Sequence, residues 1–157
     1  MDQTTGMDQT TDPQPEEVRP GLPRRRRTAV PAKPRRKGAE TPDEEALTLA
    51  RRIVDLASDK KASDIVLLEV RELTTLADYF VICSGASERQ LGAIADGITS
   101  GLRDEKTKPI GREGSANAHW LLIDYGSVIV HVMAAPEREF YQLETLWAEA
   151  PLLLRIQ

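Results

Sequence analysis

The sequence predicts a single α/β domain with a mixed five-stranded sheet packed with helices. Two observations support this fold class. Several segments begin with helix caps and continue with apolar residues at helical spacing. The segments between them are either apolar throughout or alternate between apolar and polar residues, as strands do. The resulting order, α-β-β-α-β-β-β-α, favours helices packed on a mixed sheet.

The chain divides into three parts. Residues 1–40 are predicted to be a disordered basic tail rich in Pro and Arg, because they hold too little apolar content to offset the entropy of ordering. Residues 41–150 are predicted to form the folded domain, and residues 151–157 a C-terminal extension. No apolar run approaches the roughly 20 residues of a membrane span, and the tail resembles neither a signal peptide nor a presequence. We therefore expect a cytoplasmic protein without a membrane partner.

Charge is distributed unevenly along the chain. Residues 1–40 hold nine Lys/Arg and six Asp/Glu, whereas residues 41–157 hold twelve and nineteen. A domain this acidic is a poor candidate for direct nucleic-acid binding and suits a basic partner, although acidity also serves solubility. The basic clusters at 24–27 and 35–37 are candidates for contacts with RNA; a solvated tail without a defined role is the alternative.

Two helices have clear start signals. Thr41-Pro42-Asp43-Glu44 reads as a capping box, and the helix that it opens is expected to end near Ser58. Ser87-Glu88-Arg89-Gln90 reads as a second capping box. The apolar stripe of this second helix is Leu91, Ile94, Ile98 and Leu102.

A third helix is predicted to open at Pro136 and to end at Pro151. Phe140, Leu143 and Trp147 share one stripe at spacings of three and four, which predicts that they are core residues. Tyr141 and Glu144 lie off that stripe, so we expect them at the surface.

Three further segments are predicted as strands outside the C-terminal hairpin. Residues 65–70 and 79–83 are mostly apolar, as buried strands are, and residues 109–114 form a short edge strand. The single cysteine, Cys83, lies in the second of these strands, and its apolar neighbours indicate an inert buried thiol.

Residues 119–134 read as a hairpin. If Tyr125 and Gly126 form a two-residue turn, Trp120 lies opposite His131, and Asp124 lies opposite Ser127. Alternation gives one purely aliphatic face: Leu121, Ile123, Val128, Val130 and Val132. The other face is mixed: Trp120, Leu122, Asp124, Ser127, Ile129, His131 and Met133. A mixed face is either a satisfied polar core or a surface that meets a partner.

The turn at 84–87, Ser-Gly-Ala-Ser between a strand and a helix, is a candidate site for binding an anion or a nucleotide. Backbone amides at such a helix start bind anions, but the motif lacks the Gly-Lys-Ser/Thr ending of a P-loop. No Asp-x-Asp pair of the kind that holds magnesium in a nucleotidyltransferase lies on a candidate strand. The two histidines have no third metal ligand at a regular spacing. A helix cap in a tight turn is the simpler interpretation, and we expect no metal, cofactor or small-molecule substrate.

Several segments resemble one known family, the ribosomal silencing factors (Iojap family). Residues 119–133 (HWLLIDYGSVIVHVM) and 138–147 (REFYQLETLW) are similar to the C-terminal half of that family. Residues 77–90 (ADYFVICSGASERQ) are similar to its Asp-Tyr-Phe segment, and residues 111–114 (GREG) to its Gly-x-Glu-Gly turn. The resemblance covers about residues 44–150, and His119 stands where the family commonly has an acidic residue before the Trp.

The resemblance implies a protein that is not an enzyme. Members of the family bind the large ribosomal subunit through its fourteenth ribosomal protein, block joining of the small subunit, and lower translation in starvation or stationary phase. Organelle relatives assist assembly of the large subunit, and the fold is related to nucleotidyltransferases without their metal site. A role in assembly is one alternative, and a nucleotide-binding enzyme that uses the 84–87 turn is another.

For the partner-binding site we single out residues with hot-spot character on or near the mixed face. They are Trp120, Asp124 and Tyr125, with His131, Tyr141 and Glu144 as weaker candidates. Trp120 would supply contact area, and Asp124 would orient the turn or meet a basic group. For His131 and Trp120, a purely internal cross-strand pair is the alternative. An exposed sheet edge would also allow a homodimer.

Overall fold

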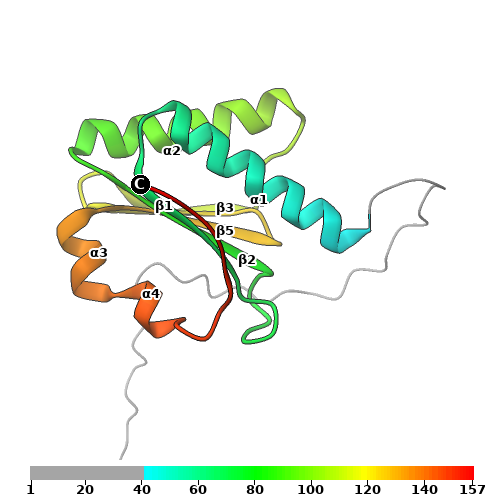
Figure 1. Ribbon diagram of the computed structural model, residues 1–157. Helices are drawn as coiled ribbons and strands as arrows, with labels where there is room; N and C mark the ends of the chain where they lie inside the picture. The colour runs from blue at the N-terminus through cyan, green and yellow to red at the C-terminus, as the bar shows by residue number, and fades with distance from the viewer. Residues whose placement is uncertain (1–40) are drawn as a thin grey trace, which may run out of the picture.

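A six-stranded mixed sheet with helices on both faces organises residues 41–157, the part of the chain that this computed structural model describes (Figure 1). The helices are α1 (Pro42–Asp59), α2 (Glu88–Asp104), α3 (Ala135–Tyr141) and α4 (Leu143–Leu146). The strands are β1 (Ser63–Glu69), β2 (Tyr79–Gly85), β3 (Gly111–Ser115), β4 (Trp120–Asp124), β5 (Val128–Ala134) and β6 (Leu152–Ile156). The predicted tail, residues 1–40, and its expected RNA contacts lie outside the described residues.

The strand order is β3-β4-β5-β2-β1-β6, and only the β2–β5 pair is parallel. The mixed α/β sheet is as predicted, but it has six strands where the sequence suggested five. The additional strand, β6, comes from the segment expected as an extension, and it runs antiparallel to β1 with Leu67 opposite Leu154. Its pairing satisfies backbone groups of β1 that would otherwise form an open, apolar sheet edge.

The two predicted helix caps differ in detail. At α1 the capping box is complete: Glu44 N donates to Thr41 Oγ1 at 3.0 Å, and Thr41 N donates to Glu44 Oε1 at 2.8 Å. At α2 the Ser87 hydroxyl accepts from Gln90 N, but the Gln90 side chain accepts from Ala86 N. None of the helices within residues 41–157 is long and apolar enough to cross a membrane.

Each face of the sheet has its own core. Helices α1 and α2 cover one face, where their apolar stripes pack on the aliphatic residues predicted for the hairpin (Figure 1). Helices α3 and α4 lie on the other face, whose core includes Phe80, Ile82, Trp120 and Leu143. The face assignment made from strand alternation is therefore confirmed.

The register of the hairpin differs from the prediction by two residues. Trp120 lies opposite Met133, Leu122 opposite His131, and the tip residues are Gly126 and Ser127. Gly126 has φ +89°, and a tight hairpin turn requires positive φ at its first central position. A shift of two residues preserves the side-chain period, so both faces keep their predicted members.

The predicted third helix is interrupted. Gln142 adopts the left-handed conformation with φ 49°, which ends α3 and starts α4 in a new direction. The break turns Leu143 into the core, whereas Phe140 is 78% exposed. The expectation of a core stripe is thus wrong for Phe140 and right for Leu143; Trp147 is half-buried, with its ring 5.1 Å from that of Phe80.

The capping box of α1 gives a first test. Thr41→Ala removes the side-chain acceptor of Glu44 N, so we expect the free energy of unfolding to fall by about 1 kcal/mol. Urea denaturation measures this change, and Thr41→Ser, which retains the acceptor, is the matched control. Equal stability of the Ala and Ser variants would show that the cap contributes nothing.

Candidate partner-docking site

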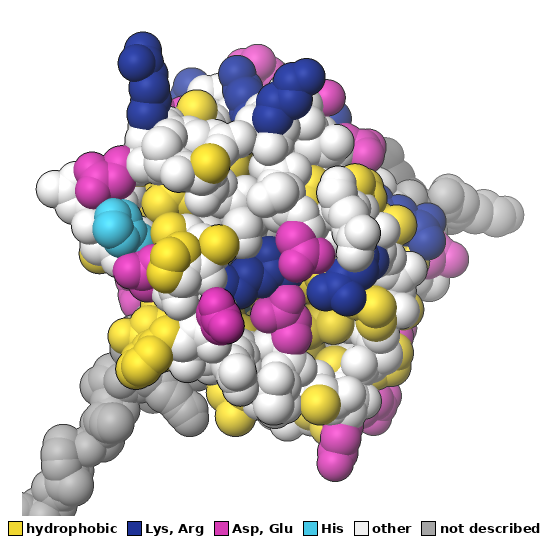
Figure 2. All heavy atoms as spheres, turned by 60° about the vertical axis from the view of Figure 1, so that its left-hand side comes forward, with side chains coloured by type: hydrophobic (Ala, Val, Ile, Leu, Met, Phe, Trp, Pro, Cys, Tyr) yellow, Lys and Arg dark blue, Asp and Glu magenta, His cyan; other side chains and the backbone are white. Residues whose placement is uncertain are grey.

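A pocket of about 320 Å³ lies where α3 crosses the ends of β3 and β4, and we refer to it as the docking pocket. Its apolar walls include Trp120, Leu122 and Tyr141, and two carboxylates, Glu113 and Glu137, line it as well. The side of the molecule that carries α3 and α4 shows hydrophobic side chains gathered beside acidic ones (Figure 2). The pocket thus combines aromatic surface with negative charge.

Strand register places these side chains together. Glu113 lies directly opposite Leu122, and Ser115 directly opposite Trp120, so all four share the α3 face of the sheet. Gly114 between them has φ +82°, and a Cβ at this position would lie 2.1 Å from the Trp120 carbonyl oxygen. Only glycine permits this approach of β3 to β4, which accounts for the glycine that ends the 111–114 motif.

The side chain of Trp120 is held by a hydrogen bond to His131 and packs against the ring of Tyr141. Its indole Nε1 donates to His131 Nδ1 at 3.2 Å, and the Tyr141 ring lies 4.7 Å away on the other side. Complete burial lowers the pKa of His131 to about 3, so the imidazole is neutral and carries its proton on Nε2. The Phe80 ring, 5.2 Å from His131, closes this internal stack.

An exposed aromatic side chain adjoins the docking pocket. Tyr141, which lines the pocket, is 39% exposed, and its ring meets that of Phe140, 78% exposed, edge to face at 5.0 Å. A large aromatic side chain that exposes most of its surface next to a pocket is typical of a protein-interaction site.

His119 bridges two helices beside the pocket. Its Nδ1 lies 3.1 Å from Glu137 Oε2 on α3, and its Nε2 lies 3.1 Å from Glu88 Oε2 at the start of α2. Hydrogen bonds to Glu137 and Glu88 raise the pKa of His119 above its ordinary value of 6.5. Only the doubly protonated ring donates to both carboxylates at once.

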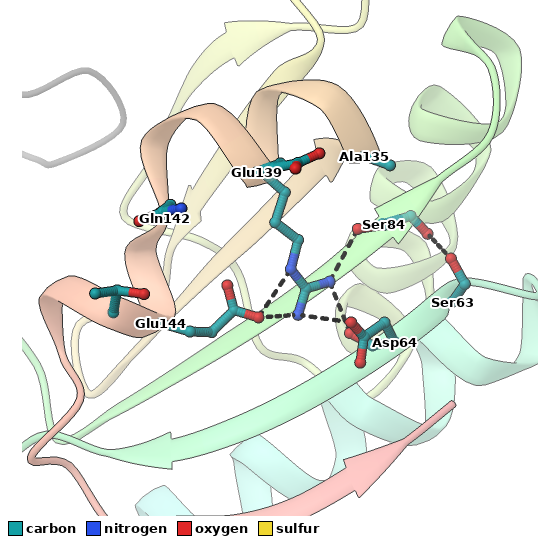
Figure 3. Close-up of a pocket in the computed structure, with 9 residues that line it drawn as sticks. Ser63, Asp64, Ser84, Ala135, Glu139, Gln142 and Glu144 are labelled. Atoms are coloured by element: carbon teal, nitrogen blue, oxygen red, sulfur yellow. Dashed lines mark hydrogen bonds and ion pairs between the residues drawn. The ribbon is translucent and has the colours of Figure 1, made fainter.

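Arg138 holds α3 and α4 against the sheet. Its guanidinium group donates to Glu144 Oε2 at 2.5 Å, to Ser84 Oγ at 2.9 Å and to the carbonyl oxygen of Asp64 at 2.7 Å (Figure 3). Arg138 is only 7% exposed, although a pocket of about 330 Å³ opens above it. Since its donors are occupied by the protein's own acceptors, we interpret Arg138 as a structural clamp.

The turn at 84–87 has its polar groups occupied as well. Ser84 Oγ accepts from Arg138, Ala86 N donates to Gln90 Oε1, and Ser87 caps α2. These bonds compete directly with an anion at the helix start, which favours the structural interpretation of the turn. Burial raises the pKa of the neighbouring Cys83 thiol to about 12, so it is protonated at neutral pH.

Within residues 41–157, no group of three or more His, Cys, Asp and Glu side chains is arranged to hold a metal ion.

The structure brings together only some of the residues predicted for the site. Trp120 and Tyr141 meet in the docking pocket, and His131 supports Trp120 from the core. Glu144 belongs to the Arg138 clamp. Asp124 and Tyr125 lie next to the tip of the hairpin, away from the docking pocket. Asp124 accepts from Gly126 N at 2.7 Å, as expected for a turn-stabilising carboxylate, and Tyr125 is buried on the α1–α2 face.

Sequence reasoning missed the acidic half of the site. Glu113 was part of the recognised 111–114 motif, but its face follows only from the pairing of β3 with β4. Glu137 was not among the predicted site residues, and the exposure of Phe140 depends on the break at Gln142. The pairing of β3 with β4 and the break at Gln142 are features that side-chain periodicity does not reveal.

The fold and the pocket describe an α/β domain suited to docking a protein partner. The chain belongs to the family described as "Ribosomal silencing factor during starvation", whose model matches residues 43–156. A curated "Ribosomal silencing factor RsfS" from Halalkalibacterium halodurans is 41% identical over 109 residues, which span 69% of this chain and 91% of the relative.

Two further relatives widen the comparison. A crystal structure of a protein from Chromobacterium violaceum matches with a TM-score of 0.64 at 31% identity, covering 66% of this chain and 86% of that one. The mouse protein "Mitochondrial assembly of ribosomal large subunit protein 1" is 35% identical over 98 residues, 60% of this chain and 43% of its own length.

The Arg138 clamp predicts a large loss of stability on truncation. Arg138→Met leaves Glu144, Ser84 and the Asp64 carbonyl without their donor, so we expect unfolding to become easier by about 3 kcal/mol. Chemical denaturation provides the measurement. The control is Arg155→Met: this arginine also pairs with Asp64 but is 42% exposed, so its loss should cost less than about 1 kcal/mol. Similar values for both variants would contradict the clamp.

His119 predicts a pH-dependent contribution to stability. Because its pKa is raised in the folded state, the bridge stabilises the domain fully below about pH 6.5, and this stabilisation disappears as the pH rises through the raised pKa. The difference in unfolding free energy between wild type and His119→Asn should therefore shrink from pH 6 towards pH 9. Asn tolerates the positive φ of 66° at this position, so backbone strain does not confuse the comparison. A difference that stays constant with pH would contradict the bridge.

Proposed function

We propose that this protein is a translational repressor that acts in the cytoplasm on the large ribosomal subunit. It binds this subunit through the fourteenth ribosomal protein and sterically blocks association with the small subunit, which lowers translation when nutrients run short. Membership of the ribosomal silencing factor family supports the proposal, as does the name of the relative from Halalkalibacterium halodurans.

The observation that carries the proposal is the docking pocket with the exposed aromatic side chain beside it. Trp120 and Tyr141 form a rigid apolar floor and wall, and Phe140 offers an exposed anchor. Residues 41–157 carry seven more acidic than basic side chains, and ribosomal proteins are generally basic. Charge of this sign accelerates encounter with a basic partner, while aromatic contacts supply affinity.

The residues singled out from the sequence have different roles in this proposal. Trp120 and Tyr141 contact the partner directly, and His131 keeps the indole in place. Asp124, Tyr125 and Glu144 position the hairpin and the α3–α4 segment, and they influence binding through that geometry. Binding by occlusion needs no chemical step, so none of these residues is given a catalytic role.

Co-sedimentation of the full-length chain with purified large subunits, small subunits and preformed whole ribosomes tests the proposal. We expect binding to the free large subunit, with loss of subunit joining on addition of small subunits. Phe140→Ala should weaken this binding roughly tenfold without loss of stability, because its side chain makes few contacts within the domain.

The control for Phe140 is Leu152→Ala, which truncates a 51% exposed side chain on the opposite edge of the sheet. Wild-type affinity of the Phe140 variant, or equal weakening by both variants, would place the partner elsewhere on the domain. Trp120→Ala is expected to weaken binding by about 2 kcal/mol or more, as truncation of a hot-spot residue does. Trp120 is only 7% exposed, however, so truncation also opens a core cavity, and Phe140 gives the cleaner test.

A role in assembly of the large subunit is the second candidate, favoured by the name of the mouse relative. The two roles differ in timing: an assembly factor binds precursor particles, whereas a repressor binds mature free subunits. Sedimentation against precursor and mature large subunits separates them.

Contact of residues 1–40 with ribosomal RNA and formation of a homodimer are further proposals. The strands at the two edges of the sheet, β3 and β6, are the places where a second copy would pair.

A further inference from the structure

The docking pocket contains a carboxylate with an unused acceptor. Glu137 Oε2 is bound by His119, but Glu137 Oε1 is buried and has no hydrogen-bond partner within residues 41–157. Glu113 contributes a second carboxylate from the facing edge strand. No Lys or Arg is found among the described residues that line the pocket, so this negative charge is not neutralised there by the protein's own cations.

The walls of the pocket suit a cation with an apolar stem. The Trp120 and Tyr141 rings are tilted by 51° with centroids 4.7 Å apart, and Leu122 continues the apolar surface. Lys and Arg side chains bury their methylene groups against such surfaces while the charged end reaches an acceptor. An aromatic wall also attracts the cation through its negative face.

We propose that the docking pocket takes up a Lys or Arg side chain of the partner protein, and that this uptake displaces a proton from His119. The inference rests on the proposed function, because it names the chemistry by which the ribosomal partner is recognised and adds a regulator of the same site.

The coupling follows from a shared carboxylate. His119 in its doubly protonated form donates to Glu88 on α2 and to Glu137 on α3, the charged groups that face it within residues 41–157. The three groups then carry a net charge of −1, and they carry −2 after the ring loses its proton to solvent. A cation that enters the pocket beside Glu137 repels the imidazolium and shares the negative charge of the same carboxylate, so it favours the neutral ring.

The coupling is reciprocal. If the incoming cation lowers the proton affinity of His119, then protonation of His119 lowers the affinity of the domain for its basic partner by the same factor. Binding is therefore tighter above the pKa of His119 than below it. Because hydrogen bonds to Glu137 and Glu88 raise the pKa of His119, the transition lies above pH 6.5.

The test measures the dissociation constant of the full-length chain for purified large subunits at pH 6 and pH 8, at constant salt and magnesium. We expect wild type to bind about tenfold more tightly at pH 8, and His119→Asn to lose most of this pH dependence. Titration of the ribosome affects both proteins equally, so it cancels when the change in dissociation constant between pH 6 and pH 8 is compared between wild type and His119→Asn. Equal affinity of wild type at both pH values would overturn the proton coupling. So would a ratio of dissociation constants at pH 6 and pH 8 that is the same in His119→Asn as in wild type.

The cationic pocket is tested separately at pH 8. Glu137→Gln and Glu113→Gln should each weaken binding about tenfold, with Glu149→Gln as a control because this carboxylate lies outside the docking pocket. Glu113 is on an exposed strand, so its variant should keep the fold, which circular dichroism checks. Binding of both variants at the level of Glu149→Gln would overturn the pocket. If the wild type binds large subunits at neither pH 6 nor pH 8, the proposed function is refuted instead.

Discussion

The parallel pairing of β2 with β5 is the constraint on which the rest of the structure depends. These two strands form the buried centre of the sheet, with Gly85 opposite Ala134 at their carboxyl ends. The chain leaves this common edge in two directions, since α2 packs on one face and α3 on the other. Elements from both faces therefore meet at one edge, and side chains that bridge them control how α3 is held.

Two such bridges have different strengths. The Arg138 clamp is buried and joins α3 to β1, β2 and α4 through charged hydrogen bonds, so it behaves as part of the core. The His119 bridge is partly exposed and depends on one proton. Glu137 and Arg138 are neighbours in α3, so this short helix is held at adjacent residues by one buried contact and one titratable contact. The docking pocket is lined by Glu137, the α3 residue of the titratable bridge.

Several features that depend on residues close together in the sequence were predicted correctly. Strand alternation assigned the two faces of the hairpin correctly even though the register was two residues off, because such a shift leaves the period unchanged. The cap of α1 was equally local. By contrast, the strand status of residues 152–156 follows from pairing with β1, distant in sequence, and the exposure of Phe140 follows from the left-handed break at Gln142, which helical periodicity does not signal. Trp120 and Tyr141 of the candidate site could be predicted from the sequence, whereas the exposed Phe140 and the acidic residues required the fold.

His119 illustrates how one side chain changes the physics of a site. Without it, Glu88 and Glu137 would be two negative charges with no shared donor between α2 and α3. The histidine gives those carboxylates a shared donor, and because its pKa is raised above 6.5 the local charge changes as the pH rises through that pKa. His119 lies in the turn before β4 with a φ of 66°, and its ring lies between Glu88 at the start of α2 and Glu137 on α3. Its protonation therefore links the contact that holds α3 to the charge beside the docking pocket.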